Sequence, residues 1–287
     1  MVKLIVLDVD GVIVGHKAGV NFPYPNQKVI SALKKVKQQG IPVVLCTGKI
    51  YHAVELIVQK AHLSNPHIAN AGALIFDPKT KKFESFNIDK NLVLNIITTC
   101  SQNKLYLEVY FENDYFIQKD AVNEITVRRT HILQKNPKIV KSLIEEVKKQ
   151  KVAKITVLAM DEQDRKRIEK LLEQYQNQAT FTWTINPSTN PWEYCMITSK
   201  EVSKAHAVKE VANSLGISLK NALGIGDTLG DWGFMKLCSY VATMEDGAPE
   251  LKRLVESKGE GKYMIAPSVN DDGILSILDY FLRDVLL

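Results

Sequence analysis

Continuous apolar runs alternate with amphipathic stretches along the first third of the chain. Each run is typical of a strand buried in a parallel sheet. The amphipathic stretches repeat apolar side chains at helical spacing, and Asn26 is placed to cap the first of them while Gly40 ends it. The elements predicted here are strands from Leu4 to Asp8, over 41–46 and over 67–70, and helices over 26–39 and 51–61. Their order predicts the doubly wound parallel sheet of an α/β fold.

The pattern changes in the middle of the chain. Residues 104–119 alternate apolar and polar side chains around a Glu-Asn-Asp turn, which predicts two strands of a half-exposed antiparallel sheet. The other elements predicted here are helices over 137–150 and 161–176 and strands near 153–160, 179–185 and 192–198. We interpret residues 81–198 as an α+β, lid-like domain inserted into a core domain formed by residues 1–80 and 199–287.

The alternation of helices and buried strands returns after residue 199. The elements predicted are helices over 204–215, from Asp231 to 237, from Pro249 and over 272–286, and strands over 222–226, 240–243 and 263–266. The last part of the chain therefore continues the parallel sheet that the first part began.

Composition narrows the class of protein. The 287 residues are 45% hydrophobic and 24% charged, which is ordinary for a soluble globular protein, and no apolar run approaches the ~18 residues that span a membrane. Asp8 and Asp10 interrupt the first apolar stretch, so we expect no secretory signal. The four cysteines form no CxxC pair and are expected to be reduced in a cytoplasmic protein.

The net charge of +5 does not point to a nucleic-acid partner. The lysines are scattered along predicted helix faces, and they are not interleaved with aromatic residues as in an RNA-binding surface. We therefore expect neither nucleic acid nor membrane as a partner. The sequence leaves the oligomeric state open.

Polar residues gather at the ends of the predicted parallel strands and at the start of the next helix. They comprise four carboxylates, one hydroxyl and one amine: Asp8, Asp10, Asp227, Asp231, Thr47 and Lys204. Ligands of open α/β sheets bind at the carboxyl ends of the strands, so we expect these groups to converge there. Unpaired carboxylates are costly to bury, whereas Mg²⁺ favours a few carboxylates together with substrate phosphate. The hydroxyl and the ammonium group are suited to phosphate oxygens.

This constellation resembles the haloacid dehalogenase (HAD) superfamily of phosphohydrolases. The four motifs of that family are matched in order by Asp8–Gly11, Thr47, Lys204 and Gly226–Asp231. The insertion lies between the second and third motifs, which is similar to the C2-capped branch that contains the Cof-type and sugar-phosphate phosphatases. Lys49 stands where the family usually has Arg after Thr-Gly. The resemblance implies a Rossmann-like HAD core with a C2-type cap.

The resemblance also implies an activity, namely Mg²⁺-dependent hydrolysis of a small phosphomonoester such as a sugar phosphate. Asp8 would be the nucleophile that forms an aspartyl-phosphate, and Asp10 the general acid and base. Thr47 and Lys204 would bind the phosphoryl oxygens, with Gly48 beside them in the substrate site.

The same resemblance implies the metal ligands. Mg²⁺ would be held by Asp8, Asp227 and the backbone carbonyl of Asp10. Asp231 would be a further ligand or would orient a metal-bound water. Three other readings stay open at this point: a phosphomutase that uses the same two aspartates, a non-catalytic metabolite-binding protein on the same fold, and a protein phosphatase.

Overall fold

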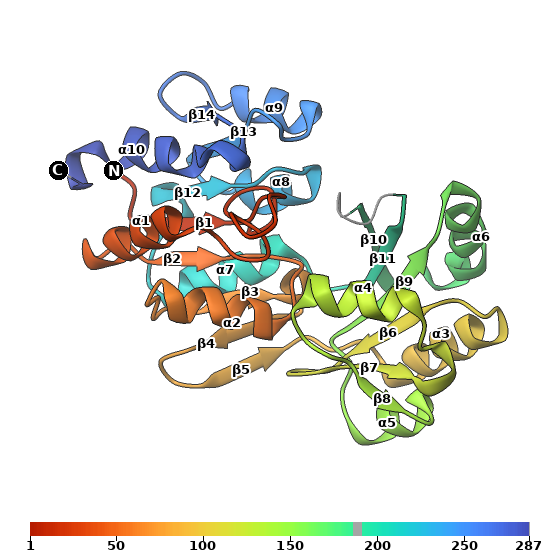
Figure 1. The fold of residues 1–287 in the computed structure, drawn as a ribbon. Helices are drawn as coiled ribbons and strands as arrows, with labels where there is room; N and C mark the ends of the chain where they lie inside the picture. The colour runs from red at the N-terminus through yellow and green to blue at the C-terminus, as the bar shows by residue number, and fades with distance from the viewer. Residues whose placement is uncertain (186–190, 287) are drawn as a thin grey trace. The chain divides into compact units, whose positions relative to one another are not determined.

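The computed structural model describes residues 1–185 and 191–286 and divides the chain into two compact units (Figure 1). The core unit comprises Met1–Glu84 and Ser203–Leu287, and the inserted unit comprises Ser85–Val202. Within the described ranges, no helix combines the length and the apolar character that crossing a bilayer requires.

A five-stranded parallel sheet forms the centre of the core unit, in the order β14-β13-β12-β1-β2. The strands are β1 (Leu4–Leu7), β2 (Val43–Leu45), β12 (Ala222–Ile225), β13 (Tyr240–Met244) and β14 (Tyr263–Ala266). All four residues of β1 are buried, because the strand has neighbours on both edges and packed side chains on both faces. The predicted α/β class with a parallel sheet is confirmed.

In the described part of the core unit, six α-helices accompany this sheet. They are α1 (Gln27–Gln38), α2 (Tyr51–Lys60), α7 (Lys204–Ser214), α8 (Leu229–Met235), α9 (Pro249–Glu256) and α10 (Gly273–Leu286). Helix α1 begins where the Asn26 side chain accepts a hydrogen bond from the backbone N–H of Val29 at 3.1 Å. Helix α1 has only 12 residues, a length that is marginal for an isolated helix in water, so packing on the sheet holds it.

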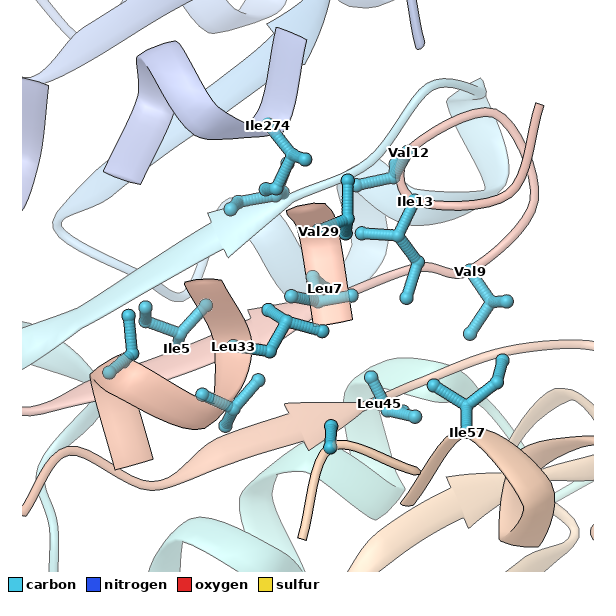
Figure 2. Packing of buried hydrophobic residues seen from close by; sticks show 14 of the residues in the cluster. Ile5, Leu7, Val9, Val12, Ile13, Val29, Leu33, Leu45, Ile57 and Ile274 are labelled. Atoms are coloured by element: carbon cyan, nitrogen blue, oxygen red, sulfur yellow. The ribbon is translucent and has the colours of Figure 1, made fainter. Parts of the chain in front are cut away.

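Figure 2 shows this packing from close by. Val29 and Leu33 of α1 lie over Ile5 and Leu7 of β1, and Ile274 of α10 points into the same cluster. The other face of the sheet is covered as well, since α8 packs on β12 and α7 packs on α8. Helices therefore cover both faces, as in a doubly wound sheet.

A smaller sheet extends the core unit beyond β2. Its strands are β3 (His67–Ala69), β4 (Leu74–Asp77) and β5 (Lys82–Ser85), in the order β3-β4-β5. An isolated parallel bridge between Cys46 and Ile68 joins β3 to the residue that follows β2. In this way β3 continues the parallel order that the sequence predicted for residues 67–70.

His67 provides a test of how this junction is stabilised. Its side chain is fully buried, and Nδ1 accepts the backbone N–H of Leu45 at 3.2 Å. Burial lowers the pKa of His67 to about 3, with Asp77 acting weakly in the opposite direction. The unfolded chain takes up this proton near pH 6.5 and the folded chain does not. We expect His67 to lower the free energy of unfolding by up to about 1.4 kcal/mol per pH unit between pH 6.5 and 3.

Urea denaturation at several pH values measures this contribution. The His67→Asn variant keeps an acceptor near the position of Nδ1 but does not titrate, so its stability should fall less steeply than that of the wild type. If the free energy of unfolding depended on pH equally in the two proteins, His67 would not be held neutral in the folded state.

The inserted unit has a six-stranded sheet in the order β10-β11-β9-β6-β7-β8. The strands are β6 (Leu107–Tyr110), β7 (Tyr115–Gln118), β8 (Lys138–Val140), β9 (Lys154–Ala159), β10 (Ala179–Ile185) and β11 (Glu193–Ser199). Neighbouring strands are antiparallel except β7 and β8. The helices of this unit are α3 (Lys90–Gln102), α4 (Glu124–Leu133), α5 (Leu143–Lys149) and α6 (Glu162–Leu172).

Two predictions for the inserted unit were wrong, and helices α3 and α4 were not predicted. Residues 137–150 are not one helix: Lys138–Val140 is strand β8, and α5 starts only after Ser142, whose side chain caps it. Residues 107–110 are not half-exposed, since α4 covers the face opposite to the one on which α3, α5 and α6 pack. A polar side chain at this buried face, Glu108, is paired with Arg129 of α4.

Candidate active site

An ammonium group bridges two buried carboxylates at one edge of the core sheet. Asp8 directly follows β1, Lys204 is the first residue of α7, and Asp231 lies in the first turn of α8. Lys204 Nζ lies 2.8 Å from Asp8 Oδ2 and 2.6 Å from Asp231 Oδ1. These two carboxylates hold the pKa of Lys204 well above its ordinary value, although burial alone would lower it.

Close backbone packing fixes the start of α7. Gly72 has φ +101°, and a Cβ there would lie 2.6 Å from the carbonyl carbon of Ser203 and 3.0 Å from the backbone nitrogen of Lys204. The Ser203 side chain accepts the backbone N–H of His206 at 3.0 Å and so caps the helix. Gly72 and the cap together place the first residue of α7 beside the end of β1.

Asp231 is held rigidly at the start of α8. Its Oδ2 accepts hydrogen bonds from the backbone N–H of Thr228 at 3.0 Å, from the Thr228 hydroxyl at 2.9 Å and from the backbone N–H of Asp227 at 3.3 Å. A Cβ at Gly226 would lie 2.3 Å from the Asp231 Cβ, so this spacing requires glycine. Burial would raise the pKa of Asp231, but Lys204 and Thr228 outweigh burial and lower it. Asp231 is therefore ionised at neutral pH.

Asp227 completes a group of three carboxylates that has only one ammonium group, that of Lys204, against it. One carboxylate oxygen from each of Asp8, Asp227 and Asp231 lies within 4.8 Å of the others. Burial, and then the neighbouring carboxylates, raise the pKa of Asp227 to about 8. Burial likewise raises the pKa of Asp8 to about 7, against the effect of Lys204. No donor in the described ranges hydrogen-bonds the Asp227 carboxylate, so this oxygen-rich group is suited to a divalent cation.

Asp10 lies outside this group of three. Its side chain is 51% exposed and forms an ion pair with Lys49 Nζ at 2.8 Å. The turn that follows it is close to this group of carboxylates, since a Cβ at Gly11 would lie 2.0 Å from Asp227 Oδ2. The Asp10 carboxylate is thus available to a substrate, while the backbone of the Asp10–Gly11 turn lies against Asp227.

The formal charges of the site also favour a divalent cation. A cation bound here would favour the ionised forms of Asp8 and Asp227, whose pKa values burial raises. With all four carboxylates ionised, including Asp10, they would face two ammonium groups, those of Lys49 and Lys204. Four negative and two positive charges leave a formal charge of −2, which one Mg²⁺ would neutralise. Oxygen donors alone are present, which matches the preference of Mg²⁺ over that of softer metals.

Thr47 and Gly48 occupy the turn after β2. Leu7 of β1 is paired in parallel with Leu45, so Asp8 and Thr47 follow neighbouring strands at the same edge of the sheet. Thr47 is buried, and its Oγ1 accepts the backbone N–H of Lys49 at 3.2 Å. That bond leaves the hydroxyl hydrogen of Thr47 for another acceptor. Gly48 lies between these two residues in the turn.

Two contacts of the site could not be predicted from the sequence. One is the ion pair between Lys49 and Asp10. The other joins the loop after Asp10 to the far end of the chain: Asn270 Oδ1 accepts the Asn21 side-chain amide at 3.2 Å and the backbone N–H of His16 at 3.1 Å. Only folding brings Asn21 and Asn270 together, because about 250 residues separate them along the chain.

The Asn270→Ala variant tests this contact. Asn21 is buried, so the loss of its acceptor leaves a polar group partly unpaired, and we expect the free energy of unfolding to fall by about 1–3 kcal/mol. Urea denaturation measures the loss. Asn213→Ala, at an exposed position of α7, is the matched control and should change stability little. Equal effects of the two substitutions would contradict this role of Asn270.

Known proteins share both the fold and the motifs. A family model described as haloacid dehalogenase-like hydrolase matches residues 5–278. Phosphatase YwpJ of Bacillus subtilis is 21% identical over 275 residues, which cover 89% of this chain and 93% of that protein. A haloacid dehalogenase-like hydrolase from Bacteroides thetaiotaomicron has a similar structure, with a TM-score of 0.83, 16% identity and coverage of 97% and 99% of the two chains. The HAD subclass IIB sugar phosphatase BT4131 aligns with a TM-score of 0.75 and 18% identity over 97% and 98% of the two chains.

The fold and the acidic site define an α/β phosphohydrolase. The chain belongs to the haloacid dehalogenase-like hydrolase family. Within that family it is a Cof-type phosphatase, which is an enzyme that acts on a phosphate ester.

Proposed function

We propose that this phosphatase hydrolyses a small phosphomonoester in an Mg²⁺-dependent reaction, with Asp8 as the nucleophile. The observation that carries the proposal is the arrangement around Asp8: its carboxylate contacts Lys204 Nζ at 2.8 Å and shares the oxygen-rich group with Asp227 and Asp231. Phosphoryl transfer depends mainly on positioning and on charge stabilisation, and this group offers both.

The residues of the site would have different roles in the reaction. Asp8 would attack phosphorus through one carboxylate oxygen, which forms an aspartyl-phosphate and breaks the bond to the leaving alkoxide. Asp10, exposed and outside the group of three, would give a proton to that alkoxide and would later take one from the attacking water. Lys204 and the hydroxyl of Thr47 would bind phosphoryl oxygens, with the Gly48 turn beside them.

Asp8, Asp227 and the backbone carbonyl of Asp10 would hold the Mg²⁺ ion, with Asp231 as an anchor. Both oxygens of Asp231 accept hydrogen bonds from the protein, so we assign it the positioning of Lys204 and of the α8 start in addition to any direct ligation. Bound Mg²⁺ supplies the positive charge that lets the anionic phosphate approach the Asp8 carboxylate.

The substrate class is proposed from the relatives. BT4131, with a TM-score of 0.75, is a sugar phosphatase, and a sugar phosphate or a similar phosphorylated metabolite is the substrate that we propose here. The inserted unit of about 120 residues would act as a lid, and lids exclude water from reacting groups. The side chains of such a lid would also select among these esters.

A substrate panel tests the proposal. Phosphate release should be measured from p-nitrophenyl phosphate and from phosphorylated sugars, with Mg²⁺ and with EDTA. We expect turnover that requires the metal and that is fastest on one group of small esters. Transfer of phosphate between positions of one sugar, without release, would instead indicate a phosphomutase. No turnover by folded protein in Mg²⁺ would indicate a metabolite-binding protein.

A further inference from the structure

Strand β10 is an unusually uncharged edge of the sheet in the inserted unit. It pairs with β11 on one side, and no strand within the described ranges pairs with its other side. Its sequence over Ala179–Ile185 is ATFTWTI, seven residues without charge or proline and with high β-propensity. Edges of this kind offer free N–H and C=O groups to another strand.

The opposite edge of the same sheet is protected against such pairing. Strand β8 is only three residues long, starts with Lys138 and is followed closely by Lys141. Short edge strands and lysines are the usual devices that prevent edge-to-edge association. Strand β10 has neither device, although Thr182 and Thr184 are exposed and Ile185 is 57% exposed.

The sequence of β10 is complementary to itself. One face carries only threonines and the other only apolar residues: Thr180, Thr182 and Thr184 against Ala179, Phe181, Trp183 and Ile185. In an antiparallel pair of two copies centred on Thr182, each residue would face one of its own kind. Threonine would lie opposite threonine, and Phe181 would lie opposite Trp183 of the second copy. Threonine pairs and aromatic pairs are among the favourable cross-strand pairs.

A hollow of about 550 Å³ lies beside this edge. It is lined by Phe181 and Trp183 of the strand, by Glu169 and Lys170 of α6, and by Glu173 directly after α6. Both aromatic side chains are only half-buried. The rim has both signs of charge, so two copies related by a two-fold axis would not meet with like charges alone.

We infer that the enzyme forms a homodimer in which β10 pairs antiparallel with β10 of a second copy across a two-fold axis at Thr182. The pair would join the two sheets into one and satisfy the free backbone groups of both edges. This inference does not depend on the proposed substrate or on the metal.

Sedimentation equilibrium of variants with a charged residue at position 182, the proposed centre of the dimer, tests this inference. The wild type should approach twice the chain mass of 32.3 kDa as its concentration rises. Thr182→Lys and Thr182→Glu each place like charges opposite one another, and each should weaken dimerisation by at least about tenfold. An equimolar mixture of these two variants should restore the dimer, because Lys then faces Glu. The matched control, Thr98→Lys at an exposed position of α3, should dimerise like the wild type.

Two results would overturn the inference. The wild type could stay monomeric at all concentrations up to about 100 μM, an affinity too weak for a specific dimer. Alternatively, the Lys and Glu variants could dimerise as well as the wild type, which would place any dimer elsewhere. Circular dichroism of each variant checks that it is folded.

A cysteine cross-link provides a second test that needs no added charge. All four native cysteines are buried, so Thr182→Cys introduces an exposed thiol. Residues directly opposite in an antiparallel pair have Cα atoms about 4.5–5.5 Å apart, within the range of a disulfide. Mild oxidation should yield a covalent dimer of Thr182→Cys but not of the control Thr98→Cys. Equal cross-linking of the two variants, or none in either, would contradict the β10 pairing.

Discussion

Replacing Asp8 by asparagine is expected to reduce phosphate release by at least about 10³-fold without loosening the fold. Asparagine has nearly the same shape but is not a competent nucleophile. Burial and the neighbouring carboxylates raise the pKa of Asp8 to about 7, so its ionised form is less favourable in the folded state than in the unfolded chain. The metal-free free energy of unfolding of Asp8→Asn at pH 7.5 should therefore equal or exceed that of the wild type.

Phosphate release and urea denaturation of the same preparations check both parts. Asp279→Asn is the matched control, because Asp279 is 73% exposed and lies far along α10 in a loose pair with Arg283. The control should keep wild-type activity. Appreciable turnover by Asp8→Asn would rule out Asp8 as the nucleophile. Unfolding of that variant would instead show that the Asp8 charge is needed for folding.

Replacing Lys204 by methionine is expected to impair both catalysis and stability. The substitution removes the ammonium group that lies 2.8 Å from Asp8 and 2.6 Å from Asp231, and the buried Asp231 keeps its charge without that partner. Breaking such a buried pair costs about 3–5 kcal/mol. Losing one group that stabilises transition-state charge costs about 10²–10³-fold in kcat.

Thermal unfolding with and without Mg²⁺ separates these effects. In Lys204→Met the carboxylates of Asp8 and Asp231 have lost their ammonium partner, so a bound cation should stabilise the folded state more. Mg²⁺ should therefore raise the Tm of Lys204→Met more than that of the wild type. Lys209→Met, exposed on the same helix, is the control and should behave as the wild type. A stable Lys204→Met protein with unchanged kcat would leave Lys204 as an ordinary helix residue.

The sequence was sufficient to predict the parallel core, since buried strands such as β1 are apolar throughout and α1 carries a regular apolar stripe. It was less informative about the inserted unit. Helix α4 lacks a strong apolar stripe because it packs on a polar face, where Arg129 reaches Glu108 at 2.7 Å. A buried ion pair looks like two exposed charges in a sequence, so the coverage of β6 could not be inferred from the pattern.

The positions of the site residues were predictable where the order of strands along the chain determines them. Asp8 and Thr47 follow neighbouring strands of a parallel sheet, and that alone brings them to one edge. Side-chain directions were not predictable. The direction of the Lys49 side chain is an example, since only the structure shows that it pairs with Asp10. The link between Asn21 and Asn270 depends on loop conformations that no periodic pattern encodes.

The most direct test of the account is to trap the covalent intermediate. The enzyme should be mixed with Mg²⁺ and a ³²P-labelled ester from the substrate panel, quenched in acid within one turnover, and mapped by peptide. We predict label on the peptide that contains Asp8, sensitive to hydroxylamine as an acyl phosphate is, and absent from Asp8→Asn. Turnover with no labelled enzyme, or with label on another residue, would contradict the assignment of Asp8 as the nucleophile.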